Sequence, residues 1–250
     1  MFIIKTSSPM YLKPTEESSL ETECLFGETI SVLDTATNWY LCKLHTDNYH
    51  GWLKKKDLGH LLAPTHRVIS IRSFLYINRS IKSPIYNYMP LGAKLTITEI
   101  KDKWAKVCLP NNFDKKSVYI LKKDIVPIDF KIKDWVSIAE KLIGTPYKWG
   151  GRNSLGIDCS ALLQLSYQNY GHDIPRNTTD QMEIRKNNSN LEKLKRGFAV
   201  FWKGHVGIMV DNLNCIHANA FHMKTVVEPL KTIIVRMKDK YPIIKIIDLN

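Results

Sequence analysis

The chain has 250 residues, and 36 Lys and Arg residues against 24 Asp and Glu residues give it a formal net charge of +12. No apolar run approaches the roughly 20 residues that a membrane-spanning helix needs, so the composition excludes a helical membrane protein. The five cysteines form no C-x-x-C pair and have no zinc-finger spacing to the eight histidines, which excludes a disulfide scaffold and a structural zinc site.

Residues 1–128 contain alternating, strand-like segments, and several features of these segments occur twice. The repeated features are Gly27 with Trp39, which recur at the same spacing as Gly92 with Trp104, and the segment 53–58, which recurs as 121–125. Two copies of several short strands each predict two small all-β barrels. The pattern resembles bacterial SH3-like domains, which we expect at residues 1–62 and 63–128.

Residues 132–143 change to helical spacing, with apolar side chains on one stripe and Gly144 as the stop. The positions on that stripe are Ile132, Trp135, Val136, Ala139, Leu142 and Ile143. This helix is expected to open a third domain, over residues 129–250.

One cysteine stands where a glycine-rich loop with aromatic residues meets the next helical segment. Asp158 suits the N-cap position, and the helix that begins at Cys159 is expected to stop at Gly171. A helix N-terminus and a nearby imidazolium both lower the pKa of a thiol, and the thiolate is its nucleophilic form. Cys159 is therefore predicted to be an activated nucleophile with a lowered pKa.

Two histidines, His205 and His217, follow in consecutive strand-like segments. A three-residue turn at 211–213 would point both side chains to one face of a sheet, whereas a two-residue turn would place them on opposite faces. In the favourable register His205 serves as the base for Cys159, and His217 fixes the orientation of the His205 ring.

A second interpretation makes these residues unrelated parts of a packed core. Free cysteine is among the most buried residue types and is usually inert, and this is the expectation for Cys24, Cys42, Cys108 and Cys215. Without an activated thiol the chain would be a binding module. Selective alkylation of Cys159 near pH 6 would separate the two interpretations.

The motifs of the third domain, taken together, resemble those of the NlpC/p60 cysteine peptidases. They are Gly-Thr-Pro-Tyr-x-Trp-Gly-Gly at 144–151, Asp-Cys-Ser at 158–160, Gly-His-Val-Gly at 204–207 and Ile-His-Ala at 216–218. The resemblance implies a papain-like α+β fold that cuts bacterial cell-wall peptides. It also implies that Cys159 is the nucleophile, His205 the base and His217 the third polar residue.

The same resemblance implies the substrate contacts. They are Tyr147 at the oxyanion, Asp158 and Ser160 at the amino end and backbone of the substrate, and Thr178 in the run Ile-Pro-Arg-Asn-Thr at 174–178. Two SH3-like barrels ahead of such a domain resemble a subgroup of recycling dipeptidyl-peptidases, in which the first barrel contacts the free amino end of the substrate. This makes Glu28 and Tyr49 candidate specificity residues.

The function expected from these residues is a cysteine endopeptidase that hydrolyses the γ-D-glutamyl–diamino acid bond of murein tri- or tetrapeptides with a free N-terminal L-Ala. An amidase or acyltransferase with the same triad, or a non-catalytic wall-peptide-binding protein, remains an alternative. No cofactor, metal or membrane insertion is expected. Nucleic acid is not an expected partner either, since no nucleic-acid-binding signature accompanies the lysines. The start of the sequence shows no basic n-region followed by an apolar h-region, so the expected location is the cytoplasm.

Overall fold

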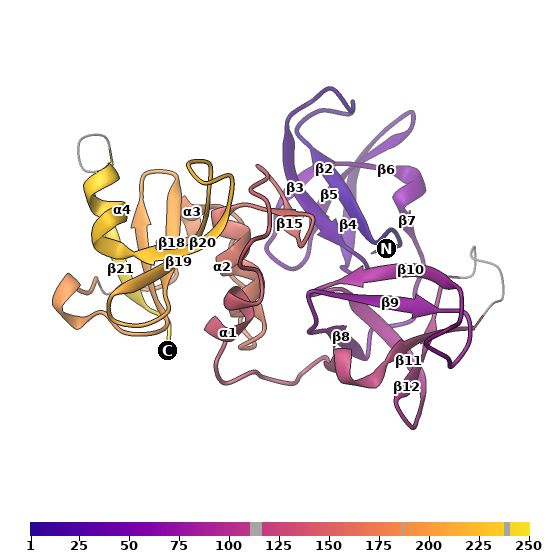
Figure 1. The fold of residues 1–250 in the computed structure, drawn as a ribbon. Coiled ribbons are helices and arrows are strands. Elements are labelled where there is room, and N and C mark those ends of the chain that lie inside the picture. The colour runs from indigo at the N-terminus through magenta and orange to yellow at the C-terminus, as the bar shows by residue number, and fades with distance from the viewer. Residues whose placement is uncertain (111–116, 187, 238–240) are drawn as a thin grey trace. The chain divides into compact units, whose positions relative to one another are not determined.

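A computed structural model describes residues 1–110, 117–186, 188–237 and 241–250 of the chain. The chain divides into two compact units, Met1–Phe130 and Lys131–Asn250 (Figure 1). The domain limits expected from the sequence, 1–62, 63–128 and 129–250, stay predictions.

The first unit is built almost entirely from antiparallel strands. Its first half contains β1 (Phe2–Ile3), β2 (Ser7–Tyr11), β3 (Leu20–Leu25), β4 (Ile30–Ala36), β5 (Trp39–Leu44), β6 (His50–Lys54), the 3₁₀ turn η1 (Lys55–Asp57) and β7 (Leu58–Gly59). Its second half contains β8 (His66–Val68), β9 (Arg72–Tyr76), β10 (Ile85–Pro90), β11 (Lys94–Lys101), β12 (Trp104–Cys108), β13 (Val118–Leu121), the 3₁₀ turn η2 (Lys122–Asp124) and β14 (Ile125–Pro127).

The two halves repeat one strand order. The first runs β3-β2-β6-β5-β4 with the pair β1-β7, and the second runs β10-β9-β13-β12-β11 with β8 and β14. The repeated residues take equivalent places, because Gly27 and Gly92 both have a positive φ and Trp39 and Trp104 both begin a strand. The internal repeat inferred from the sequence is therefore confirmed as a repeat of structure.

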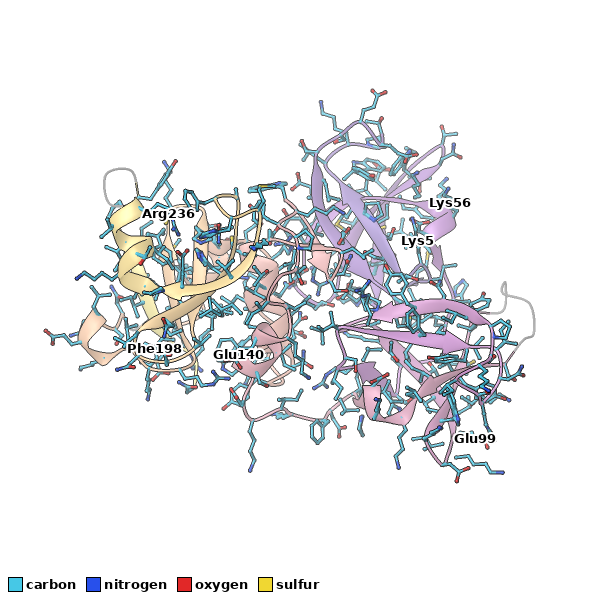
Figure 2. All side chains as sticks on the ribbon, in the orientation of Figure 1. Lys5, Lys56, Glu99, Glu140, Phe198 and Arg236 are labelled. Carbon is cyan, nitrogen blue, oxygen red and sulfur yellow. The ribbon has the colours of Figure 1, made fainter. Side chains whose placement is uncertain are left out.

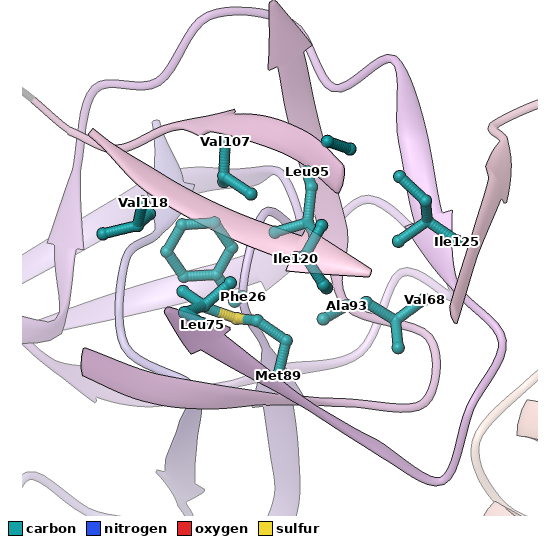
Figure 3. Close-up of a cluster of buried hydrophobic side chains, with 11 residues drawn as sticks. Phe26, Val68, Leu75, Met89, Ala93, Leu95, Val107, Val118, Ile120 and Ile125 are labelled. Atoms are coloured by element: carbon teal, nitrogen blue, oxygen red, sulfur yellow. The ribbon is translucent and has the colours of Figure 1, made fainter. Parts of the chain in front are cut away.

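Each half buries its own apolar core, and Phe26 of the first half is a buried member of the core of the second. Phe26 packs among Leu75, Met89 and Val107 (Figure 3). The backbone N–H of Lys94 donates to the carbonyl oxygen of Phe26 at 2.8 Å. A Cβ at Gly27 would lie 2.0 Å from the carbonyl oxygen of Lys94, so this close approach requires glycine.

The second unit is an α+β structure around a five-stranded antiparallel sheet in the order β20-β19-β18-β17-β21. Its elements are α1 (Val136–Glu140), β15 (Arg152–Asn153), β16 (Gly156–Ile157), α2 (Cys159–Gln168), α3 (Thr178–Gln181), η3 (Leu191–Lys193), β17 (Phe198–Trp202), β18 (His205–Met209), β19 (Asn214–Asn219), β20 (Lys224–Pro229), α4 (Leu230–Met237) and β21 (Lys245–Asp248). Helix α2 packs against β18 and β19 (Figure 1). Helix α4 contributes Ile233 to an apolar cluster that includes Trp202 and Cys215.

The helix expected over residues 132–143 is shorter than predicted, because only Val136–Glu140 is α-helical. Beyond it the backbone N–H groups of Leu142 and Ile143 donate to carbonyls three residues back, so the end of the helix tightens into turns. The predicted stripe is buried at Trp135 and Leu142, but Ile143 is 53% exposed. Gly144, with φ of +83°, ends the segment as expected.

Within the described part of the chain, no helix has both the length and the apolar character needed to cross a membrane.

Candidate active site

Cys159 occupies the first position of α2. Asp158 is the N-cap residue, and its carboxylate accepts the backbone N–H of Ala161 at 2.8 Å, as the sequence predicted. The Cys159 side chain is 7% exposed, and its sulfur lies 4.0 Å from the carbonyl oxygen of Gly204. The backbone N–H of Val206 also reaches the sulfur, so the thiol lies against the chain on both sides of His205.

The predicted lowering of the Cys159 pKa is wrong. Burial, and then the carboxylate of Asp158, raise the pKa of Cys159 to about 12. Burial and the Asp158 carboxylate outweigh three groups that favour the thiolate, namely the N–H of Val206, the guanidinium of Arg176 and the N–H of Ser160. The sequence argument counted the helix N-terminus and omitted both the burial and the adjacent carboxylate, and each of these disfavours a negative charge.

The turn between β18 and β19 has the three residues that the proposal required. The Asp211 carboxylate accepts the backbone N–H groups of Leu213 and Asn214 at 2.7 and 2.6 Å, and the N–H of Val210 donates to the carbonyl of Asn214 at 3.0 Å. The Cα pairing of Ile208 with Ile216 continues this register. The predicted register is therefore confirmed, and it gives the two histidines one face of the sheet.

His205 and His217 are hydrogen-bonded, with His205 Nε2 2.8 Å from His217 Nδ1. Burial, and then the neighbouring His217, lower the pKa of His205 to about 3. Burial also lowers the pKa of His217, against the opposing effect of Glu228. Both rings are consequently neutral near pH 7, and the resting pair is a thiol and an imidazole.

A carboxylate that the sequence analysis did not select lies behind the histidines. Glu228 Oε1, on β20, is 2.8 Å from His217 Nε2, and Arg236 on α4 donates to both oxygens of Glu228. Partial burial disfavours this charge, but the hydrogen bonds from Arg236 and His217 prevail and lower the pKa of Glu228 to about 2. The pairing of Val226 with His217 puts Glu228 diagonally opposite His217, a relation that strand alternation could have revealed only with the β19–β20 register in hand.

Tyr147 lies in the loop before α2. Its backbone N–H donates to the carbonyl of Met223 at 3.0 Å, and it forms a bridge with Ile157. Burial, followed by the charges of Cys159 and Asp158, raises the pKa of Tyr147 to about 12. Its hydroxyl therefore stays a hydrogen-bond donor in the neighbourhood of the thiol.

Asp158 and Ser160 form a buried cluster with Arg176, to which the sequence analysis gave no role. Arg176 donates to the two oxygens of Asp158 at 2.9 and 2.6 Å and to the Ser160 hydroxyl at 2.6 Å. Asp158 also accepts the Gly150 backbone N–H at 3.0 Å. Thr178 is 8% exposed and begins α3. The assignment of Asp158, Ser160 and Thr178 as substrate contacts stays a prediction.

The two candidate specificity residues lie in the first unit. Glu28 is 2% exposed, and its carboxylate accepts the backbone N–H of Leu25 at 2.7 Å and the Thr46 hydroxyl at 3.1 Å. The Tyr49 hydroxyl donates to Glu21 at 2.9 Å. Glu28 is thus a buried carboxylate rather than an ordinary surface residue, and its role toward a substrate stays a prediction.

A buried cysteine at a helix N-terminus, with a hydrogen-bonded histidine pair on the adjoining antiparallel sheet, defines the class of papain-like cysteine peptidases. Residues 144–239 match the NlpC/P60 family, and residues 10–58 match the bacterial dipeptidyl-peptidase SH3 domain. The chain therefore combines an SH3 domain of the dipeptidyl-peptidase type with an NlpC/P60 peptidase domain, as the sequence motifs indicated.

Relatives of known activity extend over most of the chain. The γ-D-glutamyl-L-lysine dipeptidyl-peptidase of Bacillus cereus is 25% identical over 255 aligned residues, which cover 87% of this chain and 73% of the relative. The enzyme of the same name from Bacillus subtilis is 25% identical, with 81% of this chain and 73% of the relative covered. The crystal structure of an NlpC/P60 family protein from Bacillus cereus superposes with a TM-score of 0.83 at 21% identity, covers 97% of both chains and shows the same fold.

Proposed function

We propose that the protein is a γ-D-glutamyl–diamino acid endopeptidase that acts on cell-wall peptides with a free N-terminal L-Ala. The observation that carries the proposal is the thiol of Cys159 lying against the backbone on either side of His205, which is itself hydrogen-bonded to His217. The names of the two Bacillus relatives supply the bond type, since they align over most of this chain.

In this mechanism Cys159 attacks the γ-carbonyl carbon of D-glutamate while its proton passes to His205. The backbone N–H of Cys159 and the Tyr147 hydroxyl donate to the oxyanion, and each such donor contributes about 3–4 kcal/mol to the transition state. The protonated His205 then donates its proton to the leaving amine of the diamino acid. Water hydrolyses the thioester with His205 as the base, which releases the L-Ala-D-Glu dipeptide and restores the thiol.

Because Cys159 and His205 are both neutral before the substrate binds, the thiolate forms only during the reaction. Since burial raises the pKa of Cys159 and lowers that of His205, the ion pair is unfavourable before the substrate binds. Proton transfer therefore accompanies attack, and the thiol acts through general-base catalysis rather than as a preformed thiolate.

The free amino end of the substrate is the proposed specificity element. A buried carboxylate opposite an ammonium forms a strong charge-assisted hydrogen bond and rejects an acylated amine. We assign this role to Glu28 with Tyr49, and substrate contacts to Asp158, Ser160 and Thr178. The proposal places the reaction in the cytoplasm as a step of cell-wall peptide recycling, where thiols stay reduced, and all five cysteines of the chain are free thiols.

The test uses L-Ala-γ-D-Glu peptides that end in meso-diaminopimelate or in L-lysine, each with a free or an N-acetylated amino end. Wild-type protein should release L-Ala-D-Glu from the free peptides, as followed by mass spectrometry, and Cys159→Ala should release none. Cys108→Ala, which removes a thiol of the first unit, is the matched control and should keep full activity.

The outcomes separate the parts of the proposal. Equal cleavage of free and acetylated peptides would retain the peptidase and overturn the role of Glu28 and Tyr49. Transfer of the dipeptide to an added amine in preference to water would point to an acyltransferase. Unchanged peptides with wild-type protein would overturn the peptidase and leave a binding module.

A further inference from the structure

The histidine pair and two residues behind it form a row of four hydrogen-bonded side chains from four consecutive elements. His205 begins β18, His217 lies in β19, Glu228 lies in β20 and Arg236 lies in α4. Of these four residues, Arg236 is labelled in Figure 2. The two central contacts, His205 Nε2 to His217 Nδ1 and His217 Nε2 to Glu228 Oε1, are each 2.8 Å. His217 is 1% exposed, so water does not replace these partners.

The positions of the hydrogens along this row of side chains follow from its last residue, Arg236. Arg236 donates to both oxygens of Glu228, which makes Glu228 an ionised, acceptor-only group. His217 Nε2 must then carry a hydrogen and donate it to Glu228. Since a neutral imidazole has one N–H, His217 Nδ1 is an acceptor, and His205 must donate to it from Nε2.

We propose that Glu228, held by Arg236, is a positioning residue that sets the tautomers of both histidines and thereby leaves His205 Nδ1 unprotonated, as the base for Cys159. This inference rests on the proposed function for its catalytic consequence, but the tautomers themselves are a property of the protein without substrate. An analogous carboxylate in serine proteases acts directly on the base, whereas here its effect is relayed through a second imidazole.

The side-chain amide of Asn219 favours the opposite tautomer of His217, with the hydrogen on Nδ1. Asn219 Nδ2 lies 3.1 Å from His217 Nε2, and its Oδ1 accepts the backbone N–H of His222 at 2.8 Å, which keeps the NH₂ group toward the ring. His222 Nε2 is 3.3 Å from Glu228 Oε1 and adds a second ring on the same carboxylate. Without the carboxylate, Asn219 would donate to His217 Nε2, and the hydrogen would move to Nδ1. His205 would then accept at Nε2 and carry its hydrogen on Nδ1, which blocks the base.

Two substitutions at one position separate loss of charge from loss of the acceptor. Glu228→Gln keeps an oxygen that can accept from His217, whereas Glu228→Met removes every acceptor at similar size. We expect kcat to fall about 10-fold in Glu228→Gln and about 100-fold in Glu228→Met, with KM within about two-fold of wild type, because second-sphere orienting residues have effects of this order. Equal losses of kcat in both variants, or a change in KM with kcat unaltered, would overturn this role of Glu228.

Glu140→Met is the matched control. Glu140, labelled in Figure 2, lies on α1 and pairs with Arg196 at 2.7 Å. The substitution therefore also removes a carboxylate from an arginine, and the side-chain hydrogen bonds of Glu140 are to Arg196 and not to a histidine. It should keep the kcat of wild type. A loss equal to that of Glu228→Met would show a general effect of breaking an ion pair and would overturn the assignment.

The direct measurement is ¹⁵N NMR of the imidazole nitrogens in the protein without substrate. In wild type, His205 and His217 should both be protonated at Nε2 and unprotonated at Nδ1. Glu228→Met should move both hydrogens to Nδ1, and Glu228→Gln should retain the wild-type pattern. If wild type already carries Nδ1–H on His205, the proposal is wrong. Because no peptide is present, this outcome does not depend on whether the proposed substrate is cleaved.

Discussion

The N-terminal end of α2 and the start of β19 each bury a cysteine, and the two thiols show how the proposed nucleophile differs from a core residue. Burial raises the pKa of both Cys159 and Cys215. Cys159 is 7% exposed and lies against backbone on both sides of His205, whereas Cys215 is fully buried in an apolar cluster with Trp202. The raised pKa is therefore common to both thiols, and the proposed nucleophile differs from the core residue in its polar neighbours and its access.

Among the tests of this comparison, removal of the proposed base, His205, should give the largest effect, which is a loss of kcat. His205→Ala should lower kcat by about 10³-fold or more, since no other group takes the proton from Cys159. Steady-state cleavage of L-Ala-γ-D-Glu-diaminopimelate measures the loss. Cys215→Ala is the control, and it should alter kcat less than about two-fold while losing about 1 kcal/mol of the free energy of unfolding. Similar kcat losses in the two variants would remove the distinction between the thiols.

The next effect concerns the polar surroundings of Cys159. Arg176→Met leaves the Asp158 carboxylate buried without its guanidinium, and breaking one side of a buried pair costs about 3–5 kcal/mol of unfolding free energy. Urea denaturation measures this loss. Lys195→Met removes the exposed partner of Asp248 and should cost less than about 1 kcal/mol. A loss at Arg176 no greater than at Lys195 would mean that the cluster does not support the start of α2.

The surroundings of Cys215 can be tested through Gly207. A Cβ at Gly207 would lie 2.3 Å from Cys215 Sγ and in ordinary contact with Trp202 and His217. Gly207→Ala should therefore lower the free energy of unfolding by about 1–3 kcal/mol through overpacking. The double variant with Cys215→Ala removes the clashing sulfur and should be more stable than Gly207→Ala alone, as measured by thermal unfolding. A double variant that is less stable than both single variants would contradict this packing.

The smallest effect is in the pH dependence of thiol reactivity. Because the pKa of Cys159 is raised to about 12, the thiolate is scarce at pH 6, and alkylation by iodoacetamide should become faster continuously from pH 6 to pH 10. The acid side of the kcat/KM profile should lie well below pH 6, since His205, with its pKa lowered to about 3, stays neutral and able to accept a proton. Rapid alkylation at pH 6 with a plateau above it would instead indicate a preformed thiolate.

Local patterns in the sequence were sufficient wherever a short segment decides its own conformation. Asp158 caps α2 through an N–H three residues away, and the Asp211 turn sets the register that aligns His205 with His217. The repeated glycines and tryptophans of the first 128 residues mark equivalent positions in two copies of one strand order. Each of these features depends on neighbours a few residues apart, or on one repeated pattern.

The sequence by itself determined the candidate nucleophile, the paired histidines and the internal repeat, because these depend on capping, strand alternation and turn length. Only the tertiary structure decided the pKa of Cys159, the short α1, the pair of Arg176 with Asp158, and Glu228 behind His217. The physical reason is that desolvation and ion pairing depend on which distant segments surround a group. Neither is encoded in the spacing of residues along the chain.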